Sequence, residues 1–427
     1  MIIYSTKITN RLVYIVQTLF SNSITITNNQ QTYLQSALVK INYSSAPITN
    51  NEIWIQPNNL LFEENITPQT IEIFYWQKLP AFFKTNGNLP FDIFSAAFFL
   101  LSRYEEYLPN KKDMYGRFAH ENSVAFKNNF LHLPLINLWL KELQSLYPFL
   151  KQQPTCFKFI PTYDIDIAYN TKHKGFIKNT GSTLKHILKL NLSAAKENIL
   201  TSIGKSNDPF DVYDDLFKIH QKLNLQPIYF FLLANKRKGY DKNLNPSLKV
   251  IHELIRKHTI KYKDGVGIHP SWQSNFDTKL LKSEITILEK ITNQKVSKSR
   301  QHYIKMSLPE TYKHLINNHI TNDYSMGYGS INGFRASYTN SFFWFDLSTN
   351  LTSNLSISPF CFMEANSFFE QKYNAQQAAE ELEQFYKIVK SVDGTFITIF
   401  HNHFITEQPQ WLAWREMYFN FLLTNFQ

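Results

Sequence analysis

Cysteine, long apolar runs and dense basic runs are scarce or absent in this sequence. The two cysteines, Cys156 and Cys361, cannot form a disulfide framework, and no Cys-x-x-Cys motif or Cys/His cluster is present for structural zinc. We expect both to be ordinary buried thiols. No apolar stretch approaches the roughly 20 residues of a transmembrane helix, so we expect no integral membrane segment. The first residues lack the basic start and apolar core of a signal peptide, and we therefore expect a cytoplasmic protein.

The excess of basic residues is spread along the chain. The sequence has 44 Lys and Arg residues against 34 Asp and Glu, which gives a formal net charge of +10. The lysines alternate with Asn, Ile and Tyr, and no RNA-binding aromatic signature accompanies them. We therefore expect no nucleic-acid partner, and the sequence does not indicate an oligomeric state.

The chain is long and apolar enough for more than one folded unit. Hydrophobic residues make up 43% of its 427 residues and aromatic residues 15%. Such a length favours two domains. We place them at residues 1–153 and 154–427, with a polar junction at residues 151–154 that ends in a proline.

The first part contains signals of both strands and helices. Alternating apolar and polar residues at 12–16 and 23–27 predict strands and hairpins. Residues 93–101 are apolar at nearly every position, which predicts a buried helix, and a second helix is predicted over residues 135–147. We therefore expect a smaller α+β domain here.

From residue 154 onward, short apolar strands alternate with amphipathic helices. Strands are predicted at residues 227–233, 266–268 and 394–400, with helices between them and a helical insertion around residues 170–205. This alternation predicts parallel α/β units. Such folds place their chemistry at the C-terminal ends of the strands.

Polar motifs follow these strand ends. Asp164 and Asp166 stand two residues apart, so both carboxylates point the same way in an extended chain. Two close carboxylates disfavour joint ionisation unless a cation neutralises them. The pair is compatible with a divalent metal site, with one carboxylate as a ligand and the other as a base. Taken alone, it equally fits a solvated loop or a helix cap. The further candidates behind strand ends are His269, the group of Arg300, His302 and Tyr303, then Asp323, and finally His401 and His403.

This order of motifs resembles the polysaccharide deacetylase family, the NodB-type carbohydrate esterases, over roughly residues 157–404. The resemblance implies a distorted (β/α) barrel that removes acetyl groups from N- or O-acetylated sugars. It also implies that Asp164 is the catalytic base and that Asp166 and His269 are metal ligands. Arg300 fits the arginine that braces the base, and His401 fits the general acid.

The chain departs from the family pattern in the motif that normally carries a second histidine. Positions 273 and 274 are Gln and Ser, so the usual Asp-His-His zinc site lacks one ligand. His302 stands where the family has a proline and is a candidate for the missing ligand. The expected cofactor is a divalent metal, zinc first, with cobalt or nickel as alternatives.

Two assignments stay open between pairs of residues. Arg335 lies in a second arginine motif and competes with Arg300 for the bracing role, and His403 competes with His401 for the role of acid. Asp323 fits the acidic residue of the fourth motif. We count Asp323, Arg335 and His403 among the candidates for substrate binding.

Aromatic residues near the motifs offer contacts for a sugar. Trp272 and Tyr303, with Phe334, can stack on a sugar face, although core packing is the alternative for each. The resemblance implies a metal-dependent hydrolase whose partner is an acetylated carbohydrate or glycan precursor. Because one histidine is missing, a second hypothesis is a catalytically impaired module that binds or assembles glycans.

The region around residues 91–117 resembles the uncharacterised domain that precedes deacetylase-like domains in some Bacteroidetes proteins. It contains a charged group at Arg103, Glu105 and Glu106. We interpret this group as an ion-pair network that fixes the end of a helix, with a functional site as the alternative.

Overall fold

The computed structural model describes residues 1–20, 24–150, 156–172, 196, 199–203 and 205–427. The predicted junction at residues 151–154 and most of the predicted insertion around 170–205 lie outside these described residues. In the part described, no helix combines the length and apolar character that crossing a membrane requires.

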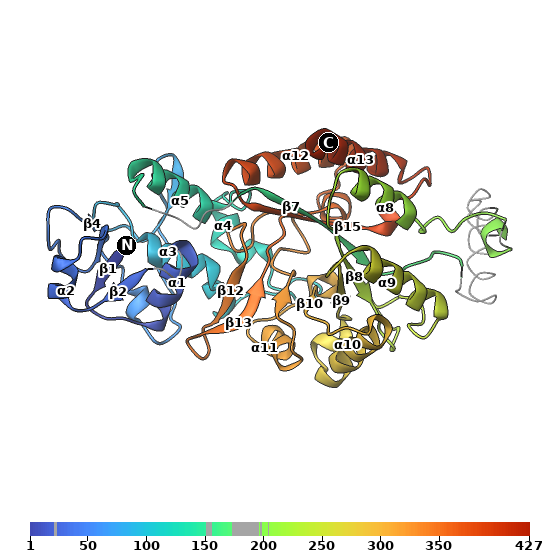
Figure 1. The fold of residues 1–427 in the computed structure, drawn as a ribbon, viewed down its shortest axis with the longest axis horizontal. Coiled ribbons are helices and arrows are strands. Elements are labelled where there is room, and N and C mark those ends of the chain that lie inside the picture. Colours follow the sequence, from blue (N-terminus) through green and yellow to red (C-terminus); the bar gives the residue numbers. More distant parts are fainter. Residues whose placement is uncertain (21–23, 151–155, 173–195, 197–198, 204) are drawn as a thin grey trace.

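The first part of the chain is built on a four-stranded parallel sheet, at the blue end of the molecule in Figure 1. In spatial order its strands are β2 (Thr25–Thr27), β1 (Ile2–Ser5), β3 (Lys40–Tyr43) and β4 (Ile53–Trp54). Parallel neighbours need a crossover segment. Helix α1 (Asn10–Phe20) connects β1 to β2, and α2 (Gln30–Gln35) connects β2 to β3.

The predictions of a strand at residues 12–16 and of hairpins there were wrong. Leu12, Ile15, Val16 and Leu19 are all buried on α1 and recur at helical spacing. The five residues 12–16 on which the strand was predicted are too few to reveal the 3.6-residue period of the helix. The predicted helices are confirmed as α3 (Ile93–Leu101), which Asp92 caps by accepting from Ser95 N, and α5 (Leu135–Leu146). A short α4 (Val124–Lys127) and the hairpin of β5 (Phe74–Trp76) and β6 (Leu79–Ala81) complete this part.

A nine-stranded sheet carries the rest of the chain. Its spatial order is β12 (Phe342–Asp346), β13 (Leu351–Ile357), β11 (Asn322–Asp323), β10 (Lys298–Ser299), β9 (Val266–His269), β8 (Ile228–Leu232), β7 (Lys158–Ile165), β15 (Thr395–His401) and β14 (Phe362–Met363). Every neighbouring pair is parallel except β12 with β13. The expected mixed α/β fold with a largely parallel sheet is confirmed. Among the described strands no pairing joins β12 to β14, so closure into a barrel stays a prediction.

Helices surround this sheet. They are α8 (Tyr213–Lys222), α9 (Lys249–Lys261), α10 (Thr278–Thr292), α11 (Glu310–Asn317), α12 (Ala375–Ser391) and α13 (Leu412–Phe426). In Figure 1, α12 and α13 lie at one edge of the view and α10 and α11 at the opposite edge, with the strands between them. Asn374 and Gln377 form a capping box that starts α12.

A buried group of charged residues joins the two parts of the chain. Arg103 binds Glu105 and Glu106 at 2.8 Å each, and Arg335 binds Glu106 through Nη2 at 2.6 Å and Nε at 2.8 Å. Arg103 also donates to the Arg335 carbonyl and to the Tyr328 hydroxyl. We call these five residues the interface cluster. The predicted ion-pair network is confirmed, and it links sequence segments more than 200 residues apart.

The two cysteines differ in their surroundings. Cys361 is buried, as expected, but Cys156 is exposed, so the expectation that both are buried was wrong. Cys156 lies two residues before the start of β7.

Candidate metal centre and active site

The end of β7 supplies two carboxylates. The strand pairs with β15 on one side and β8 on the other, so Asp164 is held between neighbours and is buried, while Asp166 follows the last strand residue and is partly exposed. Because parallel strands end at the same edge of a sheet, the polar residues that end β9 and β15 and those just after β10 meet these carboxylates there.

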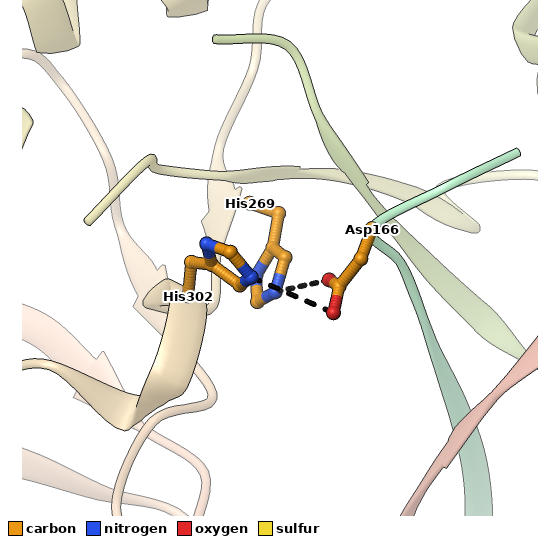
Figure 2. A group of neighbouring side chains, drawn as sticks. All are labelled: Asp166, His269 and His302. Atoms are coloured by element: carbon orange, nitrogen blue, oxygen red, sulfur yellow. Dashed lines mark ion pairs between the residues drawn. The ribbon is translucent and has the colours of Figure 1, made fainter. Parts of the chain in front are cut away.

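Asp166, His269 and His302 face one another (Figure 2). His269 Nε2 lies 3.2 Å from Asp166 Oδ1, and His302 Nε2 lies 3.5 Å from Asp166 Oδ2. The three ligand atoms lie within 4.8 Å of one another. The structure thus brings together the three residues that the sequence proposed as metal ligands.

These distances suit ligands around a metal ion. Zinc bonds to nitrogen and oxygen of about 2.1 Å, set at tetrahedral angles, place two ligand atoms about 3.4 Å apart. Asp166 Oδ1 is buried and has no hydrogen-bond partner among the described residues, even though His269 Nε2 is near it. An ion shared by the three side chains would occupy that unmet acceptor, so the donor set fits zinc.

The other nitrogen of each imidazole is bonded to the protein. His269 Nδ1 pairs with the backbone carbonyl of Arg300, and His302 Nδ1 lies 2.9 Å from Asp241 Oδ1. Such bonds fix the tautomer and the ring orientation of metal-binding histidines. In both cases they direct Nε2 toward Asp166.

Asp241 is held by the residue that replaces the expected second histidine. Asp241 is fully buried and accepts from the backbone N of Trp272 at 2.9 Å. The Gln273 side chain donates to Asp241 at 3.2 Å and to the carbonyls of Lys236 and Lys238. Gln273 therefore supports the loop that orients His302, rather than reaching the ligand group itself.

Arg300 lies beneath Asp164. Its Nη1 binds Asp164 Oδ1 at 3.0 Å and the Thr162 hydroxyl, and its Nε donates to the Tyr324 carbonyl at 3.0 Å. The guanidinium also lies 4.6 Å from the centre of the Phe230 ring. One oxygen of Asp164 is therefore engaged by Arg300, while Oδ2 lies on the side of His269, 3.7 Å from its Nε2.

His401 also approaches Asp166, at the oxygen that faces His302. Its Nε2 lies 3.8 Å from Asp166 Oδ2, and its Nδ1 lies 2.7 Å from Glu364 Oε1. The same Glu364 oxygen accepts from the His401 backbone N at 2.6 Å. Glu364 is fully buried, so it holds both the ring and the backbone of His401 in place.

The carboxylates dominate the electrostatics of the group. Burial by itself would lower the pKa of His302, but Asp166 and Asp241 raise it to about 9. Burial is likewise overcome at His401, where Glu364 and Asp166 raise the pKa to about 10. The negative potential that favours protonated imidazole equally favours a divalent cation.

The remaining sequence candidates lie apart from the ligand group. Asp323 is fully buried and accepts from Ser299 and Ser325, and Ser325 in turn accepts from Gln301 N, so Asp323 shapes the turn behind Arg300. Arg335 belongs to the interface cluster and contacts Glu106, not Asp164.

His403 and the aromatic candidates have different surroundings. The His403 ring lies 5.5 Å from that of His401, and burial together with His401 lowers its pKa to about 3. Phe334 is buried against Phe385. Tyr303 keeps 37% of its surface exposed, and Trp272 is half-buried near it.

Asp241 and Glu364 were not singled out in the sequence. Asp241 ends a polar stretch that resembles a surface loop. Glu364 follows residues 360–363, a short apolar run, and thus had the same signal as the other site residues. A polar residue directly after an apolar run could therefore have pointed to Glu364, whereas no such run precedes Asp241.

Comparisons with known proteins concern different parts of the chain. Residues 1–152 match the family of unknown function DUF7033; the nearby domain boundary predicted at residue 153 stays a prediction. No curated protein matches the chain. The structure is similar to a protein of Mycobacterium smegmatis described as a polysaccharide deacetylase, with 12% identity, a TM-score of 0.40, and coverage of 64% of this chain and 85% of that one. It is also similar to an allantoinase (12% identity, TM-score 0.38, 63% and 84% covered) and to a Bacillus cereus polysaccharide deacetylase (9%, 0.29, 64% and 88%).

Proposed function

We propose that the chain is a metal-dependent hydrolase that removes an acetyl group from an N- or O-acetylated sugar or glycan precursor. The observation that carries this proposal is the convergence of Asp166, His269 and His302 beside Asp164, with His401 Nε2 lying 3.8 Å from Asp166 Oδ2. The motif order that resembles carbohydrate deacetylases supports the choice of substrate class.

Asp166, His269 and His302 are the residues that would hold the metal. When bound there, a divalent cation supplies Lewis acidity that polarises an acyl carbonyl and makes water more acidic. Because His302 stands near Asp166 and Asp241 directs it, the absence of a histidine at position 273 no longer favours the hypothesis of an impaired module.

Asp164 is the proposed base. Arg300 engages its Oδ1 and fixes the carboxylate plane, which leaves Oδ2 to accept a proton from the attacking water. The water oxygen forms the new bond to the acetyl carbon, and the bond from that carbon to the sugar nitrogen or oxygen breaks.

His401 is the proposed acid. With Nδ1 bonded to Glu364, its Nε2 is the atom that faces the ligand group and can deliver a proton to the leaving amine or hydroxyl. Burial by itself lowers the pKa of this imidazole, but Glu364 raises it, which favours the protonated form that a general acid requires. The products are acetate and the deacetylated sugar.

The test combines metal content with acetate release. We expect the purified protein to contain one equivalent of zinc, cobalt or nickel. We expect it to release acetate from at least one of N-acetylated chito-oligosaccharides, O-acetylated xylo-oligosaccharides and UDP-N-acetylglucosamine. The hydrolase proposal is abandoned if no stoichiometric metal is found, added zinc does not raise the thermal stability, and no acetate is released.

A further inference from the structure

A group of half-exposed aromatic rings lies directly beside the ligand group. Tyr303 follows His302 in sequence, with the two rings 4.7 Å apart, and Tyr240 precedes Asp241. The rings of Tyr240 and Tyr303 lie 4.9 Å apart, and Trp272 lies 5.2 Å from Tyr240. Core tyrosines such as Tyr163 are fully buried, so the exposed surface of this group sets it apart from ordinary core packing.

The third tyrosine of this group comes from the first part of the chain. The ring of Tyr115 lies 5.3 Å from Tyr303 and 5.5 Å from Tyr240. None of the three phenol hydroxyls has a hydrogen-bond partner within the described residues. Flat apolar faces with free hydroxyls at their edges are suited to a sugar ring, which offers C–H groups and hydroxyls.

The loop that carries Tyr115 is fixed to the site by specific contacts. Lys305 Nζ donates to the carbonyls of Tyr115 and Gly116 at 2.9 and 2.8 Å. Arg117 Nη1 donates to the Tyr303 carbonyl at 2.8 Å, and Arg117 Nε binds Asp113 at 2.6 Å. These contacts tie residues 113–117 to the turn that follows His302.

Both partners of this contact contain residues with left-handed backbone conformations. Gly116 has a φ of 71°, and a Cβ there would lie 2.6 Å from Lys305 Nζ. Tyr303 and Ile304 have φ values of 59° and 52°, a left-handed conformation that is costly for residues with side chains. A donor on the Tyr303 carbonyl helps to hold that conformation. The loop of residues 113–117 is thus held next to the candidate site by specific hydrogen bonds.

We infer that the first part of the chain completes the substrate-binding surface, as a consequence of the proposed function. Tyr115, with Tyr240 and Tyr303, packs against a sugar ring of an N-acetylated oligosaccharide while the acetyl group lies at Asp164 and Asp166. Tyr115 is a substrate-contacting residue in this arrangement. Arg117 and Lys305 are positioning residues that act through the loop.

The test uses tetra-N-acetylchitotetraose with the full-length protein. For Tyr115→Ala we expect about a tenfold rise in KM, kcat within about twofold, and unchanged zinc content, because one stacked ring is lost and the ligand group is not. Tyr115→Phe, which keeps the ring, should stay within about threefold of the wild type. Tyr75→Ala is the matched control: Tyr75 is 71% exposed and lies on β5, and no ring contact or hydrogen bond joins it to the 113–117 loop.

Binding without turnover separates this inference from the proposed function. Calorimetric titration of chitotetraose into the Asp164→Asn variant, with and without Tyr115→Ala, should show affinity about tenfold weaker in the double variant. That loss would support the role of Tyr115 even if the wild type releases no acetate. If Tyr115→Ala matches Tyr75→Ala in KM and in affinity, or the protein does not bind chitotetraose, the inference is overturned. In the first of these cases the hydrolase proposal still stands.

Discussion

The interface cluster and the candidate active site are both buried groups of charged residues that include arginine and carboxylate, but they differ in how many of their polar atoms have hydrogen-bond partners. In the interface cluster, Glu106 accepts from Arg103 and Arg335 with one oxygen and again from Arg335 with the other. Arg335 uses all three of its nitrogens, the last on the Gly327 carbonyl. The bonds of this cluster are made within the protein.

The candidate active site leaves several polar atoms without such partners in the described structure. Within the part of the chain described, Asp166 Oδ1, Arg300 Nη2 and Glu364 Oε2 are buried without a hydrogen-bond partner. Each such atom costs on the order of 1–3 kcal/mol. Native proteins tolerate such atoms mainly where something else binds them. Of these two clusters, as the structure describes them, only the candidate site combines buried charge with unmet bonding capacity.

The same comparison distinguishes Arg300 from Arg335, the two arginines that the sequence offered for the role of bracing the base. Arg300 binds Asp164 through Nη1, and its Nη2 has no hydrogen-bond partner among the described residues. Arg335 instead binds Glu106. We therefore expect that disrupting the group around Asp164 and Arg300 changes activity with little effect on stability, and that disrupting the interface cluster does the reverse.

The largest effect is expected for Asp164→Asn. An amide cannot take the proton from water, so acetate release should fall by about a thousandfold or more. The zinc content should stay at the wild-type value because Asp166, His269 and His302 are untouched. Metal analysis and single-turnover acetate assays measure both. Undiminished acetate release in this variant would remove Asp164 from the role of base.

The next effect is on stability, from Glu106→Gln. The substitution leaves Arg103 and Arg335 buried with one carboxylate fewer, and breaking a buried ion pair typically costs about 3–5 kcal/mol. We expect urea unfolding to show that loss in free energy, and acetate release per folded molecule to stay within twofold.

A surface glutamate provides the matched control for that variant. Glu121 is 62% exposed and lies 3.6 Å from His120, so Glu121→Gln should change the free energy of unfolding by less than about 0.5 kcal/mol. A Glu106→Gln variant with wild-type stability but reduced acetate release would reverse the assignment of the two clusters.

Much of the fold could be predicted because strand and helix signals are local. Apolar runs predicted β8, β9 and β15, and apolar residues at nearly every position predicted α3. The antiparallel pair β12–β13 was not predicted, nor was α1, where a helical stripe resembles strand alternation over a few residues.

The site divides in the same way. Asp164, Asp166, His269 and His401 each stand at the end of a recognisable strand, and the topology of a parallel sheet brings such ends together. The approach of Tyr115 to Tyr303 depends on how two regions pack, 188 positions apart in sequence, and no local pattern encodes that contact.

A smaller effect is expected for Asp241→Asn. It weakens the bond that orients His302, and loss of such a supporting carboxylate costs about 10–100-fold in metal affinity. Competition with a zinc chelator at pH 7 measures the change. Asp214→Asn, on a residue 73% exposed and paired with Lys257, is the control and should bind zinc as the wild type does. Equal zinc affinity in both variants would contradict the role of Asp241.

The smallest expected effect is a loss of folding stability at low pH that comes from Glu106. Burial would raise the pKa of Glu106, but Arg335 and Arg103 lower it to about 2, against an ordinary value of 4.5. A carboxylate with a depressed pKa stabilises the fold above pH 4.5, and this contribution is lost as the pH falls toward 2. Between pH 7 and pH 4 the loss amounts to about 0.8 kcal/mol.

Other carboxyl groups titrate in the same range, so the measurement is a difference: urea unfolding at both pH values for the wild type and for Glu106→Gln. The wild type should lose about 0.8 kcal/mol more than the variant, because the glutamine has no proton to gain; equal losses would mean that the interface cluster does not hold Glu106 ionised.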